Sequence, residues 1–296
     1  MKVFGNYVTN AKEVSNIFVE HFAKVSRKSE DVPGFQYRNK EHRTLDFTSN
    51  GGESYNLPFT IREFDFALAN CSNTAPGPDE IPYEMIRHVS GETKLFLIGL
   101  INRIWRESNY PSVWEFATVL PFSKPGKDRF LATSYRPIAL TSCLSKLMEK
   151  MVNARLVWYL ERQGTLSPAQ CGFRRMHSTT NVLVRLESSI CEAFASKHHH
   201  ITVFFDLEKA YDTTWRFGIL KILHECGLRG EMPLFIKAFL ARRFFKVKVG
   251  SELSEMKCQE EGVPQGCVLS VTLFALAING VRSDIPPENF IHLIRR

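Results

Sequence analysis

The stretch Ile201-Thr-Val-Phe-Phe-Asp206-Leu-Glu-Lys-Ala-Tyr211-Asp212 decides the fold of this chain. Its first five residues are β-branched or aromatic, which is typical of a strand buried on both faces. The run ends on Asp206, and a carboxylate held at an open sheet edge is well placed to bind Mg2+. The same aspartate could instead cap the segment that follows. We therefore expect a buried strand over 201–205 with a candidate metal ligand at its end.

A second informative segment is the turn Gly262-Val-Pro-Gln265-Gly266, which opens a further helix. Glycine lets the backbone approach a ligand closely, and the amide of Gln265 could hydrogen-bond a nucleotide or a template strand. A tight turn explains the tetrapeptide equally well. Tyr211 could stack under a sugar or simply fill the core. We expect Asp206 and Gln265 to share one cleft.

Cations accompany turns in two other places. Lys124 begins the turn Lys-Pro-Gly-Lys, and Arg136 lies in Ser-Tyr-Arg-Pro. Arginine binds phosphate through a bidentate fork and lysine as a point charge, so both are candidate phosphate ligands. Arg174 and Arg175 follow a phenylalanine, a combination suited to single-stranded nucleic acid. Solvated turns are the alternative in each case.

The composition is that of a globular protein with a polyanionic partner. Of 296 residues, 44% are hydrophobic and 23% are charged, and the formal net charge is +7. The seven cysteines are odd in number and form no Cys-x-x-Cys pair, which favours reduced thiols in an intracellular protein, nuclear or cytoplasmic. The N-terminus lacks the apolar core of a signal peptide, and the apolar runs are too short to span a bilayer, so no membrane is expected.

The pattern along the chain predicts an α+β fold, with several helices around a few short strands. We divide the sequence into a helical N-terminal extension and linker (1–58), a main domain (59–285) and a tail (286–296). Strands are expected over 117–122 and 135–140, with a hairpin over 245–260. The helices are expected over 11–26, 60–70, 82–90, 92–108, 142–164, 178–196, 215–225, 231–242 and 268–281.

Six segments, taken in their order along the chain, resemble the reverse transcriptase domain of non-LTR (LINE-type) retrotransposons. Their sequences are most similar to those of jockey-like elements. The resemblance covers roughly residues 60–285. The segments are Thr74–Pro82, Lys124–Lys127, Ser134–Thr141, Leu166–Arg174, Phe205–Asp212 and Gly262–Ser270.

The resemblance implies a right-hand polymerase with fingers and a partial palm, without the thumb. It implies nucleotidyl transfer directed by an RNA template, from a DNA primer and deoxynucleoside triphosphates, on two Mg2+ ions about 4 Å apart. The implied metal ligands are Asp206 and the carbonyl of Leu207. The implied nucleotide-binding residues are Lys124, Arg136, Tyr211, Gln265 and Gly266, and the implied template-binding residues are Arg174 and Arg175.

The sequence departs from the family at one motif, an aromatic-x-Asp-Asp hairpin expected after Val281. The 296 residues contain no Asp-Asp pair, and Asp284 lies on the wrong side of a Pro-Pro turn. We expect a truncated or frameshifted copy that is catalytically incomplete and poorly soluble. The alternatives are a non-catalytic remnant that binds RNA or RNA–DNA hybrid, a maturase-like or telomerase-like protein, and a pseudogene product without function.

Overall fold

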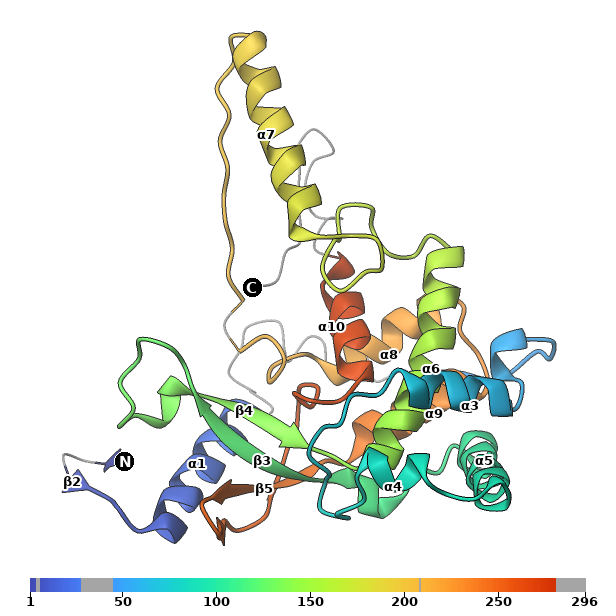
Figure 1. Ribbon diagram of the computed structural model, residues 1–296. Helices are drawn as coiled ribbons and strands as arrows, with labels where there is room; N and C mark the ends of the chain where they lie inside the picture. The colour runs from blue at the N-terminus through green and yellow to red at the C-terminus, as the bar shows by residue number, and fades with distance from the viewer. Residues whose placement is uncertain (4–5, 28–44, 208, 281–296) are drawn as a thin grey trace.

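The computed structural model describes residues 1–3, 6–27, 45–207 and 209–280. A mixed sheet, a body of helices beside it and one projecting helix make up the molecule (Figure 1). This mixed helix-and-sheet arrangement agrees with the predicted α+β class. The tail 286–296, Asp284 and most of the linker, residues 28–44, lie outside the described residues.

The sheet has the strand order β4-β3-β5-β6, with β7 also paired to β5. β3 (Phe116–Ser123) and β4 (Tyr135–Leu140) form an antiparallel pair, which confirms the two predicted strands. β5 (Phe244–Val249) runs parallel to β3 and pairs antiparallel with β6 (Glu252–Leu253) and with β7 (Lys257–Cys258). A short pair, β1 (Lys2–Val3) and β2 (Asn6–Tyr7), lies at the N-terminus.

Helix α1 (Ala11–Val25) covers one face of this sheet. The side chain of Asn10 caps the helix by accepting from the backbone N–H groups of the first turn. A small hydrophobic core joins helix and sheet, and it consists of Phe18, Val19, Phe22, Ala23, Val119, Ala139, Phe245 and Val247. The segment that the sequence assigned to an N-terminal extension therefore packs directly on strands from the main domain.

The helical body surrounds α6 (Cys143–Arg162), whose Leu147, Met148, Val152 and Leu156 are fully buried. Helix α3 (Ile61–Ala69) begins with a capping box, in which Thr60 and Glu63 bond reciprocally. The irregular segment 45–58 is packed rather than loose, because Arg155 of α6 donates to its backbone carbonyls. The other helices are α3 (Ile61–Ala69), α4 (Tyr83–Arg87), α5 (Gly91–Glu107), α8 (Arg216–Glu225), α9 (Glu231–Ala241) and α10 (Leu269–Asn279), with 3-10 turns at Ser54–Asn56, Ser112–Glu115 and Ala132–Ser134.

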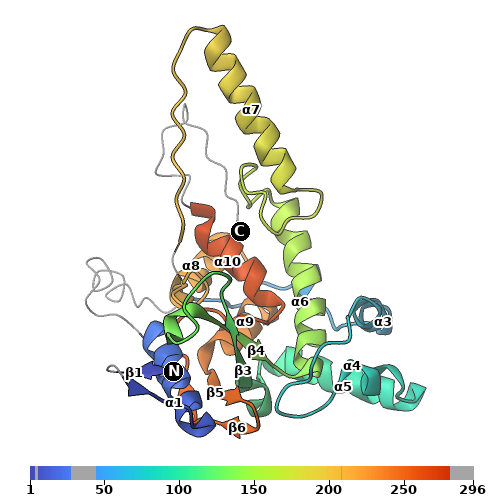
Figure 2. The ribbon, with the colours of Figure 1, turned by 60° about the vertical axis from the view of Figure 1, so that its left-hand side comes forward.

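Helix α7 (Thr179–Ala195) projects from the body in both views, and the chain then returns as an extended segment (Figures 1 and 2). Residues 201–205 of that segment are not the buried strand that the sequence predicted. They are exposed, with Phe205 86% accessible, and no strand of the described residues pairs with them. β-branched and aromatic residues favour a strand, but only a neighbouring strand can satisfy its backbone hydrogen bonds.

None of the helices in the described ranges combines the length and apolar character needed to cross a bilayer.

Candidate functional site

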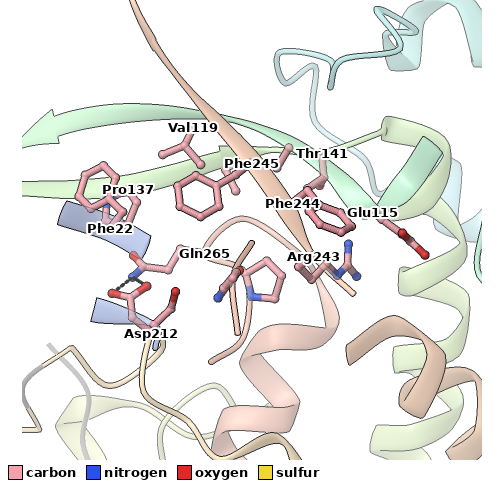
Figure 3. A pocket seen from close by; sticks show the side chains of 15 residues that line it. Phe22, Glu115, Val119, Pro137, Thr141, Asp212, Arg243, Phe244, Phe245 and Gln265 are labelled. Atoms are coloured by element: carbon pink, nitrogen blue, oxygen red, sulfur yellow. Dashed lines mark hydrogen bonds between the residues drawn. The ribbon is translucent and has the colours of Figure 1, made fainter. Parts of the chain in front are cut away.

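A pocket lies where α1, the sheet and the turn 262–266 meet (Figure 3). Its volume is about 40 Å³, room for a few water molecules rather than for a nucleotide. We call it the Gln265 pocket. It is lined by Phe22, Ser26, Glu115, Ala117, Val119, Pro137, Ala139, Thr141, Asp212, Arg243, Phe244, Phe245, Gln259, Pro264 and Gln265.

The turn 262–266 is docked on β4 through its backbone. The N–H of Ala139 donates to the carbonyl of Gln265 over 2.7 Å. Gly266 has φ +129°, and a Cβ there would lie 2.3 Å from the carbonyl oxygen of Ala139. Only glycine fits this close approach. The sequence therefore placed a glycine where the sheet and the turn touch.

The same turn is tied to residues 211–214. The N–H of Val263 donates to the carbonyl of Tyr211 over 2.8 Å, and that of Gly262 donates to Thr214 over 2.9 Å. These backbone bonds bring the end of the Phe205–Asp212 segment against the glycine-rich turn. Two motifs that lie far apart in sequence thus form one structural unit.

Asp212 is the carboxylate that contacts Gln265. The Gln265 Nε2 lies 3.1 Å from both Asp212 carboxylate oxygens and donates to them (Figure 3). Burial raises the pKa of Asp212 to about 6, against the lowering effects of the Gln265 hydrogen bond and of Lys209 and Lys124. Asp212 ends the Phe205–Asp212 segment, but the sequence alone predicts no role for it. An acidic residue at the end of that motif was the available signal.

Asp206 and Leu207 lie elsewhere. Both are exposed on the extended segment after α7, and neither lines the Gln265 pocket. The expectation that Asp206 shares this pocket with Gln265 is therefore wrong for the described structure. The reason is the missing strand: without paired neighbours, no sheet edge holds the Asp206 carboxylate. The metal-binding roles of Asp206 and of the Leu207 carbonyl stay predictions.

The remaining predicted nucleotide ligands differ in their surroundings. Lys124 is partly buried and its Nζ donates to the Thr133 carbonyl over 2.9 Å, while Arg136 is exposed on β4. The Tyr211 ring is 4% exposed and stacks on Phe274, with centroids 4.9 Å apart and planes at 20°. Tyr211 thus fills the core, as the alternative reading of the sequence had it. The binding roles of these three residues stay predictions.

The two arginines predicted to face a template are not equivalent. Arg174 forms a two-pronged ion pair with Glu161 at 2.9 and 2.6 Å and also donates to the Ser167 carbonyl. Arg175 is exposed. Arg174 is therefore engaged in holding the loop after α6, and Arg175 is the more accessible cation. Template binding by either stays a prediction.

A buried polar network, which includes Arg243 of the pocket lining, was not foreseen from the sequence. Arg243, 3% exposed, donates to the Trp114 carbonyl over 3.0 Å and to the Tyr110 hydroxyl over 3.1 Å. Glu149, fully buried on α6, accepts from the backbone N–H of Val268 over 2.8 Å at the start of α10. Burial raises the pKa of Glu149. This network anchors the helix that follows the 262–266 turn, and nothing in the local sequence marks either charge as buried.

The described residues do not fit a site for two divalent ions. Such ions need several converging carboxylate oxygens. Within the described ranges, no group of three or more His, Cys, Asp or Glu side chains could hold a metal. Asp206 stands apart from the pocket, and Asp212 is engaged by Gln265.

Comparison with known proteins places these motifs in one family. Residues 123–294 match the family described as reverse transcriptase (RNA-dependent DNA polymerase). The chain is 33% identical over 239 residues to the probable RNA-directed DNA polymerase from transposon BS of Drosophila melanogaster, which covers 80% of this chain and 26% of that protein.

Two further relatives come from the same fly. The probable RNA-directed DNA polymerase from transposon X-element is 33% identical over 69% of this chain and 22% of its own length. The RNA-directed DNA polymerase from mobile element jockey is 30% identical over 72% of this chain and 23% of its own length. The chain thus spans about a quarter of the length of these relatives.

Proposed function

Because the chain belongs to the reverse transcriptase family and resembles LINE-type elements, we propose that it is the template- and nucleotide-facing part of an RNA-directed DNA polymerase. Its substrates would be an RNA template, a DNA primer and deoxynucleoside triphosphates. The sheet β3–β5 would belong to the fingers, and the helices around the 262–266 turn would belong to the palm. In this proposal the two Mg2+ ions expected for the family belong to the whole polymerase, because the described residues do not fit a site for them.

The observation that carries the proposal is the convergence at the Gln265 pocket. Three segments of the family pattern meet there: β4 with Ala139, the segment ending in Asp212, and the turn with Gln265. The Asp212 carboxylate fixes the amide of Gln265, and the glycine at 266 lets the turn pack closely on β4 beside it. A nucleotide would contact the rim of this pocket, because the pocket itself is too small to enclose one.

We further propose that these 296 residues by themselves hold nucleic acid without extending a primer. The sequence has no Asp-Asp pair, and the described carboxylates do not converge on a metal site. Template-directed transfer depends on charge stabilisation by the paired ions, so their loss costs many orders of magnitude in rate.

A specific feature favours binding of RNA or RNA–DNA hybrid. The sheet face opposite α1 carries the exposed cations Arg136, Lys246 and Lys248. The exposed side chains Phe122 and Ile138 lie on the same face, because Phe122 pairs with Arg136 and Ile138 with Leu120 across the strands. Cations bind phosphates and an aromatic ring stacks on bases, so this face suits a single strand.

Titration of fluorescently labelled single-stranded RNA at several salt concentrations tests the binding proposal. We expect the affinity to fall steeply with salt. The double substitution Lys246→Ala and Lys248→Ala should lower the slope of log K against log salt by about 2. The exposed Lys237→Ala on α9 is the matched control and should leave the slope unchanged. Affinity that is independent of salt would contradict the proposal.

Primer extension on an RNA template with Mg2+ tests the catalytic part. We expect no incorporation above that of an Asp206→Ala variant. Incorporation well above that control would show that the 296 residues hold their metals after all. An absence of both RNA binding and incorporation would refute the proposed function as a whole.

A further inference from the structure

Helix α1 is joined to the segment 253–261 by a regular series of polar contacts. They run in the same order along both segments, from the start of the helix to just beyond its end. The contacts are Lys12 Nζ to the Leu253 carbonyl at 2.6 Å, the Glu255 N–H to Asn16 Oδ1 at 2.9 Å, Lys257 Nζ to Glu20 Oε1 at 2.5 Å, and the Glu261 N–H to the Ser26 carbonyl at 2.8 Å.

The spacing of the first three contacts is a match between a helix and a strand. The residues on α1 are four apart, which keeps them on one stripe and advances about 6 Å along the axis. Their partners are two apart in a segment bounded by β6 and β7, and a strand advances about 6.6 Å over two residues. The two repeats therefore stay in step over these three contacts.

The last contact leads directly into the candidate site. Glu261 precedes the 262–266 turn, and its carboxylate accepts from the backbone N–H of Arg216 over 3.1 Å. Phe22 of α1 and Ser26, its C-cap residue, line the Gln265 pocket together with Asp212 and Gln265 (Figure 3). The C-terminal end of α1 is thus both an anchor of the turn and a wall of the pocket.

The charges that act on His21 of α1 also act on the Gln265 pocket. Burial lowers the pKa of His21, and Lys209 and Lys124 lower it further. The same two lysines oppose the burial that raises the pKa of Asp212. His21 and Asp212 are therefore under the influence of one pair of cations, as expected if this face of α1 is part of the site.

We propose that α1 is a positioning element of the Gln265 pocket, which holds segment 253–261 so that Gln265 stays against Asp212. The helix lies outside the residues 123–294 that match the family, so this role belongs to a part of the chain that the family match does not cover. Sheet packing by Phe18 and Val19 would stabilise the fold in any case. The polar contacts have an additional role, because they fix the register of segment 253–261, which leads to the turn 262–266. Only the consequence for RNA binding rests on the proposed function.

Charge reversal at one contact tests the proposal. In Glu20→Lys or Lys257→Glu the attractive pair becomes a repulsive one, and the double variant restores an ion pair of opposite sense. Glu13→Lys is the matched control, since it makes the same charge change on another exposed position of α1. Amide hydrogen exchange over 259–266 is the measurement, with α6 and α9 as internal references for global stability.

We expect each single reversal to speed exchange over 259–266 by about two- to fivefold, as the loss of a partly exposed pair implies. The double variant should return the rate to that of the wild type, while the control and the reference helices do not change. Unchanged exchange in the single variants, equal acceleration in α6 and α9, or failure of the double variant to rescue would each overturn the proposal.

RNA affinity measured on the same variants separates the two proposals. Weaker binding in the single variants with recovery in the double would link α1 to the function of the site. If the wild-type chain binds no RNA, the proposed function fails, and the exchange data still decide whether α1 positions the turn.

Discussion

Replacing Asp212 by asparagine should remove a pH dependence of stability that the wild-type protein shows between pH 3.8 and about 6. The Asp212 carboxyl is partly buried beside Gln265, and burial is the main cause of its raised pKa. Asparagine has nearly the same shape and carries no charge at any pH. The substitution therefore tests the ionisation of this side chain rather than its packing.

Whether the free energy of unfolding rises or falls with pH follows from the pKa values of Asp212 in the folded and the unfolded chain. Below pH 3.8 the carboxyl is protonated in both folded and unfolded chains. As the pH rises towards about 6, the unfolded chain releases its proton while the folded chain keeps it, so the free energy of unfolding falls. The difference of about two pKa units corresponds to at most about 3 kcal/mol lost over this range. Above it the contribution is constant.

The Asp212→Asn variant should lose none of this stability as the pH rises. It faces the Gln265 Nε2 with one oxygen instead of two, which costs about 1 kcal/mol at every pH. We therefore expect the variant to be slightly less stable than the wild type near pH 4 and more stable near pH 7.

Urea unfolding at half-unit steps between pH 4 and 7.5 gives the measurement. The exposed Asp128→Asn serves as the control for a general loss of negative charge. A stability difference between wild type and Asp212→Asn that is the same at all pH values would refute the reasoning, because it would mean that Asp212 is not destabilised by burial.

The remaining predictions concern the buried network, the turn and the loop after α6. Arg243→Met should lower the free energy of unfolding by about 3–5 kcal/mol, because it removes a buried, hydrogen-bonded cation from a network with an acidic member; urea unfolding measures this. Gly262→Ala should cost about 1–3 kcal/mol more than Gly250→Ala: both positions have positive φ, but only at the first would the new Cβ lie 2.4 Å from a backbone oxygen. Arg174→Ala should destabilise the chain by about 1–3 kcal/mol, whereas Arg175→Ala should leave stability within about 0.5 kcal/mol and lower the salt dependence of RNA binding. Equal effects of the two arginines in both assays would contradict their assignment.

Much of the helical structure could be predicted because its signals are local. The capping box at Thr60 and the side-chain cap at Ser142 each mark a helix start within one turn. The strands β3 and β4 were also found, since they are neighbours in the sequence, joined by the loop 124–134. The parallel pairing of β3 with β5 was beyond reach, because those strands are distant in sequence and no turn links them.

The candidate site was foreseen only in part. Gln265 and Gly266 could be identified because the glycine-rich turn matches a sequence motif of the family. Its partner could not, since the hydrogen bond from Gln265 to Asp212 spans 53 residues and depends on how two segments dock. The prediction of a strand ending at Asp206 was wrong for a related reason. The residues 201–205 favour the extended conformation, but a strand forms only where a neighbouring strand accepts and donates its backbone hydrogen bonds.

The sequence by itself determined the family, most helix boundaries and the glycine-rich turn, because each depends on residues within a few positions of one another or on an ordered series of motifs. The tertiary structure decided that Asp212 meets Gln265, that Arg243 is buried, and that α1 is built into the sheet and the pocket rather than standing apart. Burial and long-range hydrogen bonds are properties of how distant segments pack, and no single stretch of sequence carries them.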